Sequence, residues 1–338
     1  MPYKTDWLKD EKSSLPGAFV RQPNRFTTPF GTGPGELPVE SGRYRLIWSA
    51  ACPWATRQMI ARSLLGLEDA VSSGLVDPVR PRPDAEGARP IPGEVDMPKD
   101  LRGFRLDWAF TLDPGSTDPV LGVKYLSDLY LNADPGYTGR FTVPAVADIA
   151  SKKVVNNDYF NLTYYWETVW KPFYKEGAPD LYPEKLREKI NALNEVIFHE
   201  INNGVYKAGF ARTQAAYEDA FALVFKRLDW LDGRLSESRY LFGSALTDSD
   251  IRLYVTLVRF DFAYYNVFRL NRQRLRDFPN LWGYTRDLYQ IPAFGKNTLF
   301  DHIKKHYHIC CDPGNQFGIV PVGPEEAVFN TAHGRGGL

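Results

Sequence analysis

One cysteine, Cys52, stands where a strand-like run gives way to a helical run. Residues 44–48 alternate along the chain, which predicts a strand. Apolar side chains then recur at helical spacing over residues 59–67, which predicts a helix. Pro53 suits the first helical position because it lacks only an N–H that has no partner inside the helix. Cys52 is therefore predicted to be the N-cap of this helix.

A cysteine at a helix N-terminus faces unpaired N–H groups and the positive end of the helix dipole. Both favour the thiolate, which is the nucleophilic form. The structural alternative is a small buried residue at a strand–helix junction. The motif is Cys-Pro-Trp-Ala. A dithiol oxidoreductase has its resolving cysteine three residues after the first one, and this chain has an alanine there. A monothiol that forms a mixed disulfide needs a small thiol from solution to release it.

Composition narrows the classes of function. The chain has 338 residues, enough for two domains, and its 41 basic residues balance 41 acidic ones. This balance predicts no nucleic-acid and no membrane partner. No apolar run approaches a membrane span, and the polar N-terminus lacks a signal-peptide core. Three cysteines cannot build a disulfide framework, so we expect a cytoplasmic protein.

The first half has the pattern of a thioredoxin-like domain, predicted over residues 43–172. The run Arg140 to Val146 is rich in β-formers but is broken by Pro144, and in thioredoxin-like domains such a Val-Pro bond is cis. Asp158 is predicted to cap a helix over residues 159–170. The predicted order is β-α-β-insert-α-β-β-α, with further elements at residues 70–79, 125–131 and 154–155 and a loop at 78–98.

The second half, residues 173–324, is predicted to be an all-helical domain. Apolar stripes run along residues 186–201 and 217–235. Thr247 and Asp250 in the segment LTDSDI form a capping box at the start of a mostly apolar helix. Residues 1–42 are predicted to be an extended arm, and residues 325–338 a tail. The expected fold class is thus α/β plus all-α.

This pattern resembles the glutathione transferases, with a thioredoxin-like domain followed by a helical domain of their type. It is closest to the glutathionyl-hydroquinone reductases, the Xi class. The segments that carry the resemblance extend from about residue 43 to residue 324. They are SAACPWATR, DWAF, GRFTVPAV, NNGVYKAGFA, RFDFAYYNVFRLN, LWGYTRDLYQIP, FDHIKKHY and GIVPVGP.

The resemblance implies a reaction. In this family the cysteine attacks the sulfur of a glutathionyl-hydroquinone, the aromatic carbon leaves as hydroquinone, and a second thiol frees the enzyme. It implies that Cys52 is the nucleophile. Glutathione or another low-molecular-weight thiol is the expected co-substrate, with a small aromatic quinone or hydroquinone conjugate as the other partner. No metal is expected. The protein is expected to form a homodimer.

The resemblance also implies the residues of the site. In the family, tyrosines surround the aromatic ring, where one donates a proton and others support the thiolate. A phenol is protonated at neutral pH and can do both. Each of these side chains also has a purely structural interpretation, as a core aromatic or a surface ion-pair residue. The expected thiol-binding residues are Trp108, Arg140, Phe141, Thr142, Val143, Asp158 and Tyr159, and the expected tyrosines are Tyr206, Tyr264 and Tyr307.

Two positions depart from the family pattern. Asp158-Tyr159 stands where the family usually has Glu-Ser, whose side chains hold the γ-glutamyl end of glutathione. Another small thiol, such as mycothiol, is therefore an alternative co-substrate. Thr56 stands where the family commonly has a histidine, which removes a cation near the thiol. The helix dipole and the tyrosines still support the thiolate.

Cys310 and Cys311 are adjacent in a segment that also contains His302, His306 and His308. A metal site is conceivable, but neighbouring cysteines are awkward joint ligands, so a resolving role for Cys310 is favoured over it. Two other functions fit the same scaffold. One is a glutaredoxin-like or dehydroascorbate reductase activity, and the other is a non-catalytic binding protein.

Overall fold

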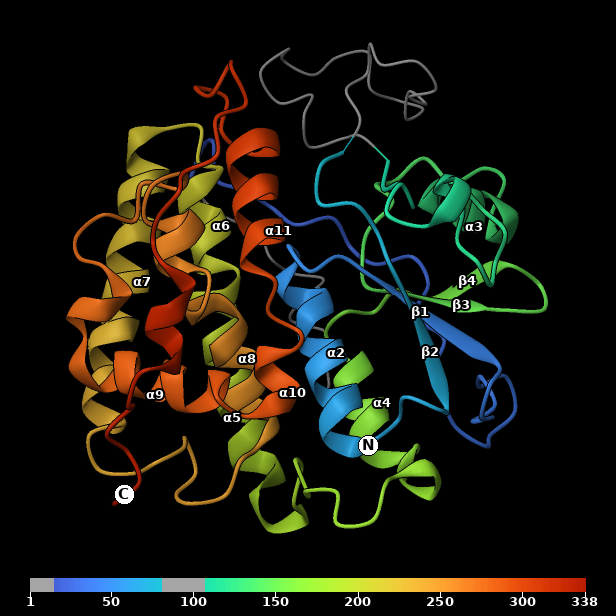
Figure 1. Cartoon of the computed structure of the whole chain (residues 1–338), viewed down its shortest axis with the longest axis horizontal. Coiled ribbons are helices and arrows are strands. Elements are labelled where there is room, and N and C mark those ends of the chain that lie inside the picture. The colour runs from blue at the N-terminus through green and yellow to red at the C-terminus, as the bar shows by residue number, and fades with distance from the viewer. Residues whose placement is uncertain (1–14, 81–106) are drawn as a thin grey trace. The chain divides into compact units, whose positions relative to one another are not determined.

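The computed structural model describes residues 15–80 and 107–338. They form two compact units, a sheet unit and a helical unit (Figure 1). The sheet unit comprises residues 24–80, 107–178 and 301–320, and the helical unit comprises residues 15–23, 179–300 and 321–338. This division differs from the predicted one. Residues 24–42, 173–178 and 301–320 belong to the sheet unit, and residues 15–23 and the tail after residue 325 belong to the helical unit.

The sheet unit is built on a mixed sheet with the order β2-β1-β3-β4. Strands β1 (Tyr44–Trp48) and β2 (Val71–Leu75) are parallel, and Trp48 pairs with Leu75 at their carboxyl ends. Strand β3 (Ala145–Asp148) runs antiparallel to β1, and β4 (Lys153–Asn156) runs antiparallel to β3. All residues of β1 are buried, as expected for a central strand with both faces covered.

The helices of the sheet unit confirm the predicted element order. Helix α2 (Pro53–Leu65) follows β1 and ends at Gly66, whose φ of 70° is the left-handed conformation that favours glycine. Helix α2 packs against α4, and α3 packs against β4. The other helical elements are η2 (Pro114–Ser116), α3 (Leu126–Ala133), α4 (Leu162–Thr168), η3 (Lys171–Phe173), α11 (Phe300–Lys305) and η8 (His306–Cys310).

The helix predicted over residues 159–170 is shorter in the structure. Asp158 does accept hydrogen bonds from the N–H groups of Phe160 and Asn161, both at 3.3 Å. These bonds close a turn, and regular helix begins only at Leu162, after the N-cap Asn161. The prediction was therefore wrong about the cap, since Asp158 stabilises the turn that precedes the helix. Most of the loop predicted over residues 78–98 lies outside the described residues.

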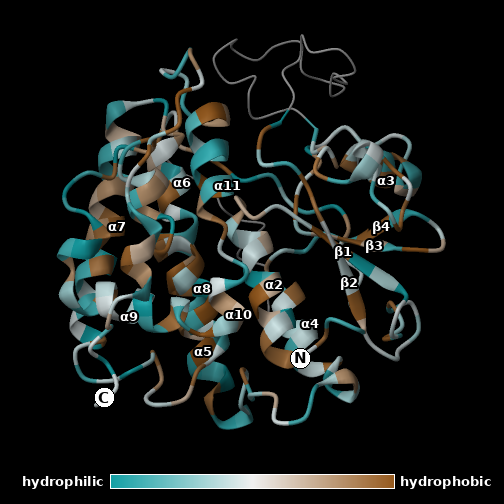
Figure 2. Ribbon diagram, viewed as in Figure 1, coloured by the Kyte–Doolittle hydropathy of each residue, from teal (hydrophilic) through white to brown (hydrophobic). Residues whose placement is uncertain are grey.

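The helical unit contains the predicted stripes as amphipathic helices. Ala220, Val224, Leu228 and Leu231 form the buried face of α7 (Gln214–Arg234), and Figure 2 shows hydrophobic and polar positions alternating around this helix. The remaining elements are η4 (Glu184–Leu186), α5 (Arg187–Ile197), η5 (Phe198–Asn202), α6 (Gly204–Gly209), α8 (Asp248–Leu257), η6 (Phe260–Tyr264), η7 (Leu275–Asp277), α9 (Pro279–Tyr289), α10 (Pro292–Gly295) and η9 (Glu326–Asn330).

The predicted capping box at the start of α8 is confirmed. The Asp250 carboxylate accepts from the Thr247 N–H at 2.9 Å and from the Thr247 hydroxyl at 2.8 Å. Its second oxygen accepts from the Leu241 N–H at 2.9 Å and from the Tyr284 hydroxyl at 2.8 Å. All four groups belong to buried residues, so this one carboxylate joins α8, α9 and the loop before α8.

Among the described residues, no helix combines the length and the apolar character that a membrane crossing requires.

We predict that Asp250→Ala lowers the free energy of unfolding by about 3 kcal/mol or more, because it removes the cap and leaves buried donors on Leu241 and Tyr284 unsatisfied. Urea titration followed by circular dichroism measures the change. The matched control is Asp277→Ala, since Asp277 accepts the Arg274 N–H at 3.0 Å at an exposed turn. The control is expected to cost less than about 1 kcal/mol. Equal losses in the two variants would contradict the prediction.

Candidate functional site

Cys52 lies where the sequence predicted it, at the N-cap of α2, with Pro53 at the first helical position. Its φ and ψ of −80° and 117° are extended, and its carbonyl accepts the Thr56 N–H at 2.9 Å. The side chain is half-buried, and all three cysteines of the chain are outside any disulfide. The thiol therefore combines access with a place at the positive end of a helix.

The Cys52 thiol donates to the carbonyl oxygen of Val143, with 3.3 Å between Sγ and O. The Val143–Pro144 peptide bond is cis, as predicted. The two residues meet because β3 begins where β1 ends, with Ile47 paired to Ala145. A thiol donates this bond but a thiolate cannot, so ionisation of Cys52 leaves the Val143 carbonyl oxygen available as an acceptor.

Hydrogen bonds fix the segment from Arg140 to Val143. The Tyr137 hydroxyl donates to the Arg140 carbonyl at 2.9 Å, and the Tyr130 hydroxyl donates to the Thr142 carbonyl at 2.7 Å. Burial raises the pKa of Tyr130, which keeps this phenol protonated and donating. The Phe141 ring packs against both tyrosine rings. These contacts fix the backbone from Arg140 to Thr142, the segment that leads to Val143 and its contact with Cys52.

The Asp158-Tyr159 turn lies beside helix α2. The Tyr159 carbonyl accepts from the guanidinium of Arg57 and from Gln58 Nε2, the latter at 3.2 Å, and the Tyr159 ring packs on Trp54 at 4.9 Å between centroids. The Asp158 carboxylate is buried and also accepts from Asn161 Nδ2 at 2.7 Å. This pair therefore belongs to the same end of the sheet unit as Cys52, but its carboxylate is engaged within its own turn.

Trp108 is buried and stacks on two partners. The Arg80 guanidinium carbon lies 3.9 Å from the Trp108 ring centroid, and the His306 ring stacks on Trp108 at 5.3 Å and 22°. Trp108 is 2% exposed, and its indole Nε1 is a buried donor that has no hydrogen-bond partner among residues 15–80 and 107–338. A buried donor without such a partner is suited to a ligand acceptor.

His306 is held neutral. Its Nδ1 lies 2.7 Å from the Pro78 carbonyl oxygen and therefore donates its proton there. Burial, aided by the nearby charge of Arg80, lowers the pKa of His306 to about 3. At neutral pH the ring consequently stacks on Trp108 as an uncharged aromatic group.

The segment with Tyr307, Cys310 and Cys311 belongs to the sheet unit, and Tyr307 is 2% exposed. Burial raises the pKa of the Cys310 thiol and, more strongly, that of Cys311. Cys310 Sγ lies 4.0 Å from the Pro78 carbonyl oxygen that also accepts from His306. Over residues 15–80 and 107–338, no three His, Cys, Asp or Glu side chains are grouped as a metal site requires.

Tyr206 and Tyr264 come together in the helical unit. Their ring centroids are 6.1 Å apart, and both rings pack against Phe268. The Arg21 guanidinium lies 5.0 Å from the Tyr206 ring centroid. Tyr206 is 8% exposed, whereas Tyr264 is fully buried. The structure thus pairs two of the three predicted tyrosines, while Tyr307 accompanies Cys52 in the sheet unit.

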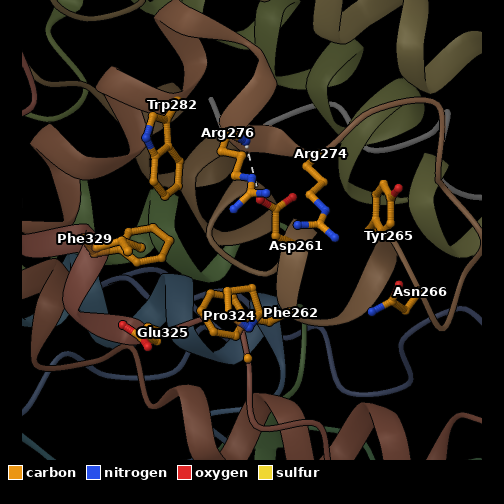
Figure 3. Close-up of a pocket in the computed structure, with 12 residues that line it drawn as sticks. Asp261, Phe262, Tyr265, Asn266, Arg274, Arg276, Trp282, Pro324, Glu325 and Phe329 are labelled. Carbon is orange, nitrogen blue, oxygen red and sulfur yellow. Dashed lines mark hydrogen bonds between the residues drawn. The ribbon is translucent and has the colours of Figure 1, made fainter.

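The helical unit also has a cavity of about 410 Å³. Figure 3 shows the rings of Trp282 and Phe329 on one side, Phe262 next to Pro324, and the arginines Arg274 and Arg276 near Asp261. Asp261 accepts the Leu275 N–H at 2.6 Å, which anchors the loop that carries both arginines. None of the residues predicted for the thiol or aromatic-ring site lines this cavity.

Sequence reasoning missed Arg80 and the stacking role of His306. A signal for Arg80 was present in the chain. Arg80 follows the second strand by five residues, as Cys52 follows the first by four, and the carboxyl ends of adjacent parallel strands share an edge. The stacking of His306 had no such signal, because residues 301–320 were assigned to the helical domain.

The chain is similar to glutathione transferases and to glutathionyl-hydroquinone reductases. Residues 214–287 match the family model of the glutathione S-transferase C-terminal domain. The chain is 38% identical to glutathionyl-hydroquinone reductase YqjG of Escherichia coli, covering 96% of this chain and 94% of that one. It is 36% identical to glutathionyl-hydroquinone reductase PcpF of Sphingobium chlorophenolicum, covering 94% and 93% of the two chains.

Solved structures agree. A glutathione transferase from Gordonia bronchialis is 44% identical, with a TM-score of 0.79, and the match covers 88% of this chain and 86% of that one. The Xi transferase of Phanerochaete chrysosporium is 37% identical, with a TM-score of 0.80 and coverage of 94% and 96%. This chain therefore belongs to the glutathionyl-hydroquinone reductases, the Xi class of the glutathione transferases, and is an enzyme of that family.

Proposed function

We propose that this enzyme reduces S-glutathionyl-hydroquinone-type conjugates to hydroquinones through a mixed disulfide on Cys52. The observation that carries the proposal is the position of Cys52, half-buried at the N-cap of α2 and 3.3 Å from the Val143 carbonyl. Relatives named glutathionyl-hydroquinone reductases support the same activity. The helix dipole and its N–H groups favour the thiolate that this reaction needs.

The proposed reaction balances in two steps. The Cys52 thiolate attacks the sulfur of the conjugate, so an S–S bond forms while the bond between sulfur and aromatic carbon breaks. The ring carbon takes the electron pair of that bond and a proton, and leaves as the hydroquinone. A second small thiol then attacks the mixed disulfide, which restores Cys52 and releases a disulfide of the two small thiols.

Phenols are suited to supply the proton. Tyr206, Tyr264 and Tyr307 are the tyrosines that we propose surround the aromatic ring, one as proton donor and the others as supports of the thiolate. Tyr206 and Tyr264 already share an aromatic cluster, and Tyr307 adjoins His306, which faces Trp108. A homodimer stays a prediction.

The co-substrate is proposed to be glutathione or another small thiol held by Trp108, Arg140–Val143 and Asp158-Tyr159. The Nε1 of Trp108 offers the thiol ligand a hydrogen-bond donor, and the Val143 carbonyl next to the cis-proline offers it an acceptor. Asp158 is already bonded to Asn161, which supports a weaker hold on the γ-glutamyl end than a longer glutamate gives. Mycothiol is accordingly the alternative thiol.

The first prediction concerns the nucleophile. Wild-type protein mixed with glutathionyl-menadiol is expected to gain one glutathione on Cys52 and to release menadiol, because Cys52 is the attacking thiolate. Cys52→Ala is expected to do neither. Intact-protein mass spectrometry with chromatography of menadiol measures both products. Cys310→Ser is the matched control and keeps the adduct. An adduct that persists in Cys52→Ala, or an unreactive wild type, would refute the mechanism.

The second prediction concerns the proton donor. At least one of Tyr206→Phe, Tyr264→Phe and Tyr307→Phe is expected to lower kcat by about 100-fold, the usual contribution of a general acid. Steady-state release of menadiol measures it. The control is Tyr254→Phe, because the buried Tyr254 hydroxyl is 2.9 Å from Thr298 Oγ1 and has a structural partner. If all three variants keep kcat within about threefold of wild type, the donor is another group.

The third prediction concerns the thiol. The double variant Asp158→Glu, Tyr159→Ser is expected to lower the KM for glutathione by about tenfold, because it restores a longer carboxylate and a small hydroxyl. Tyr159→Ser alone is the control, since it keeps the backbone carbonyl that Arg57 and Gln58 contact. Clearance of the Cys52 adduct by glutathione and by mycothiol is compared. An unchanged KM for glutathione would show that this pair does not set thiol preference.

A further inference from the structure

Three chain segments converge at one edge of the sheet. Strands β1 and β2 are parallel and end in register at Trp48 and Leu75, so the residues that follow them leave the sheet side by side. The pairing continues one step, because the Val76 N–H donates to the Trp48 carbonyl at 2.9 Å. Cys52 follows β1 at this edge, and Arg80 follows β2. Strand β3, preceded by Val143, starts at the same edge.

The side chain of Arg80 is fixed at this edge by aromatic packing. Its guanidinium lies 3.9 Å from the Trp108 ring centroid, close enough for a strong cation–π contact. The backbone just before it is held from two sides, since the Pro78 carbonyl accepts from His306 Nδ1 and the Asp77 N–H donates to the Ala109 carbonyl at 2.9 Å. The cation therefore has a defined position on Trp108, in the segment that leaves the sheet next to the turn with Cys52.

Among the described residues, the acidic groups near Arg80 include three thiols and one carboxyl group. Burial lowers the pKa of the Arg80 guanidinium, and ionised Cys310, Cys311, Asp107 and Cys52, in decreasing order of effect, raise it. Asp107 also accepts from the N–H groups of Trp108 and Ser127, at 2.8 and 3.1 Å. Burial raises the pKa of Asp107 to about 6, so it is mainly ionised at pH 7 and competes for the Arg80 charge. His306 is neutral there, and Thr56 on α2 carries no charge.

We propose that Arg80 is a positioning residue whose guanidinium, held on the Trp108 ring at the shared edge of β1 and β2, favours the thiolate of Cys52. An arginine stays charged at every pH at which a thiol titrates. An opposite charge nearby stabilises the ionised form of an acid, and it does so more strongly in a partly buried site than in water. The inference rests on Cys52 being the nucleophile of the proposed function.

Cys310 competes for the same cation. An ionised Cys310 interacts with Arg80 more strongly than an ionised Cys52 does. Burial raises the pKa of the Cys310 thiol, however, which favours its neutral form. The thiolate of Cys52 is favoured further because Cys52 is the N-cap of α2, where the positive end of the helix dipole stabilises a negative charge. The charge of Arg80 is then expected to add to the helix effect at Cys52.

The test measures ionisation of Cys52 directly. The rate of alkylation by iodoacetamide is followed from pH 5 to pH 10, and mass spectrometry of peptides separates Cys52 from Cys310 and Cys311. Arg80→Met is expected to move the midpoint for Cys52 to higher pH and to slow alkylation about tenfold at neutral pH. Arg80→Lys keeps the charge and is expected to restore most of the wild-type profile. Arg276→Met, an exposed arginine of the helical unit, is the control and leaves the profile unchanged.

The outcomes separate two failures. If wild-type Cys52 does not react, the proposed function fails before Arg80 is tested. If wild-type Cys52 reacts and Arg80→Met has the same midpoint, the inference about Arg80 is wrong and the function stands. If Arg80→Met and Arg80→Lys slow the reaction equally without moving the midpoint, Arg80 only packs against Trp108, which also overturns the inference. Tryptophan fluorescence of each variant reports whether that packing is retained.

Discussion

The parallel pairing of β1 and β2 is the constraint on which the sheet unit depends. It sends the turn with Cys52 and the segment with Arg80 out of the same edge, and the antiparallel β3 brings Val143 to that edge from the other side. At a different register these segments would not leave the sheet side by side, and a shift of one residue would turn every strand side chain to the opposite face of the sheet. The strands are short, so packing on both faces must hold this register.

Backbone hydrogen bonds and buried phenols do much of that holding. Tyr130 connects Thr142 on one side with Asn157 on the other, so a single hydroxyl joins the approach to the cis-proline with the turn before α4. The Tyr159 carbonyl, fixed by α2 residues, ties the same turn to the helix that begins at Cys52. These hydrogen bonds therefore connect the approach to the cis-proline, the turn before α4 and the helix that begins after Cys52.

The two groups stacked on Trp108 differ in charge. A cation lies on the Trp108 ring, and the histidine stacked on that ring is neutral because its pKa is lowered to about 3. His306 therefore adds no positive charge beside the Trp108 ring between pH 5 and pH 8, the range in which histidine usually acts as a switch. Thr56, at the start of α2, is buried and uncharged as well.

The sequence alone determined the place of Cys52 at a helix start, the cis-proline segment and the order of elements in the sheet unit, because these depend on local rules. A proline after Cys52 suits a helix start, and a Val-Pro in a β-rich run marks a special turn whatever surrounds it. The capping box of α8 is equally local, since both partners lie within four residues. The family resemblance added the chemistry.

Only the tertiary structure decided where distant segments go. Residues 301–320 pack in the sheet unit although they follow nine tenths of the chain, and this brings His306 onto Trp108. Asp158 bonds within its own turn because Asn161 is within reach of its short side chain, so regular helix starts later than capping rules predict. Such outcomes depend on which non-local contacts bury most surface and satisfy most polar groups, and neither spacing nor residue type contains that information.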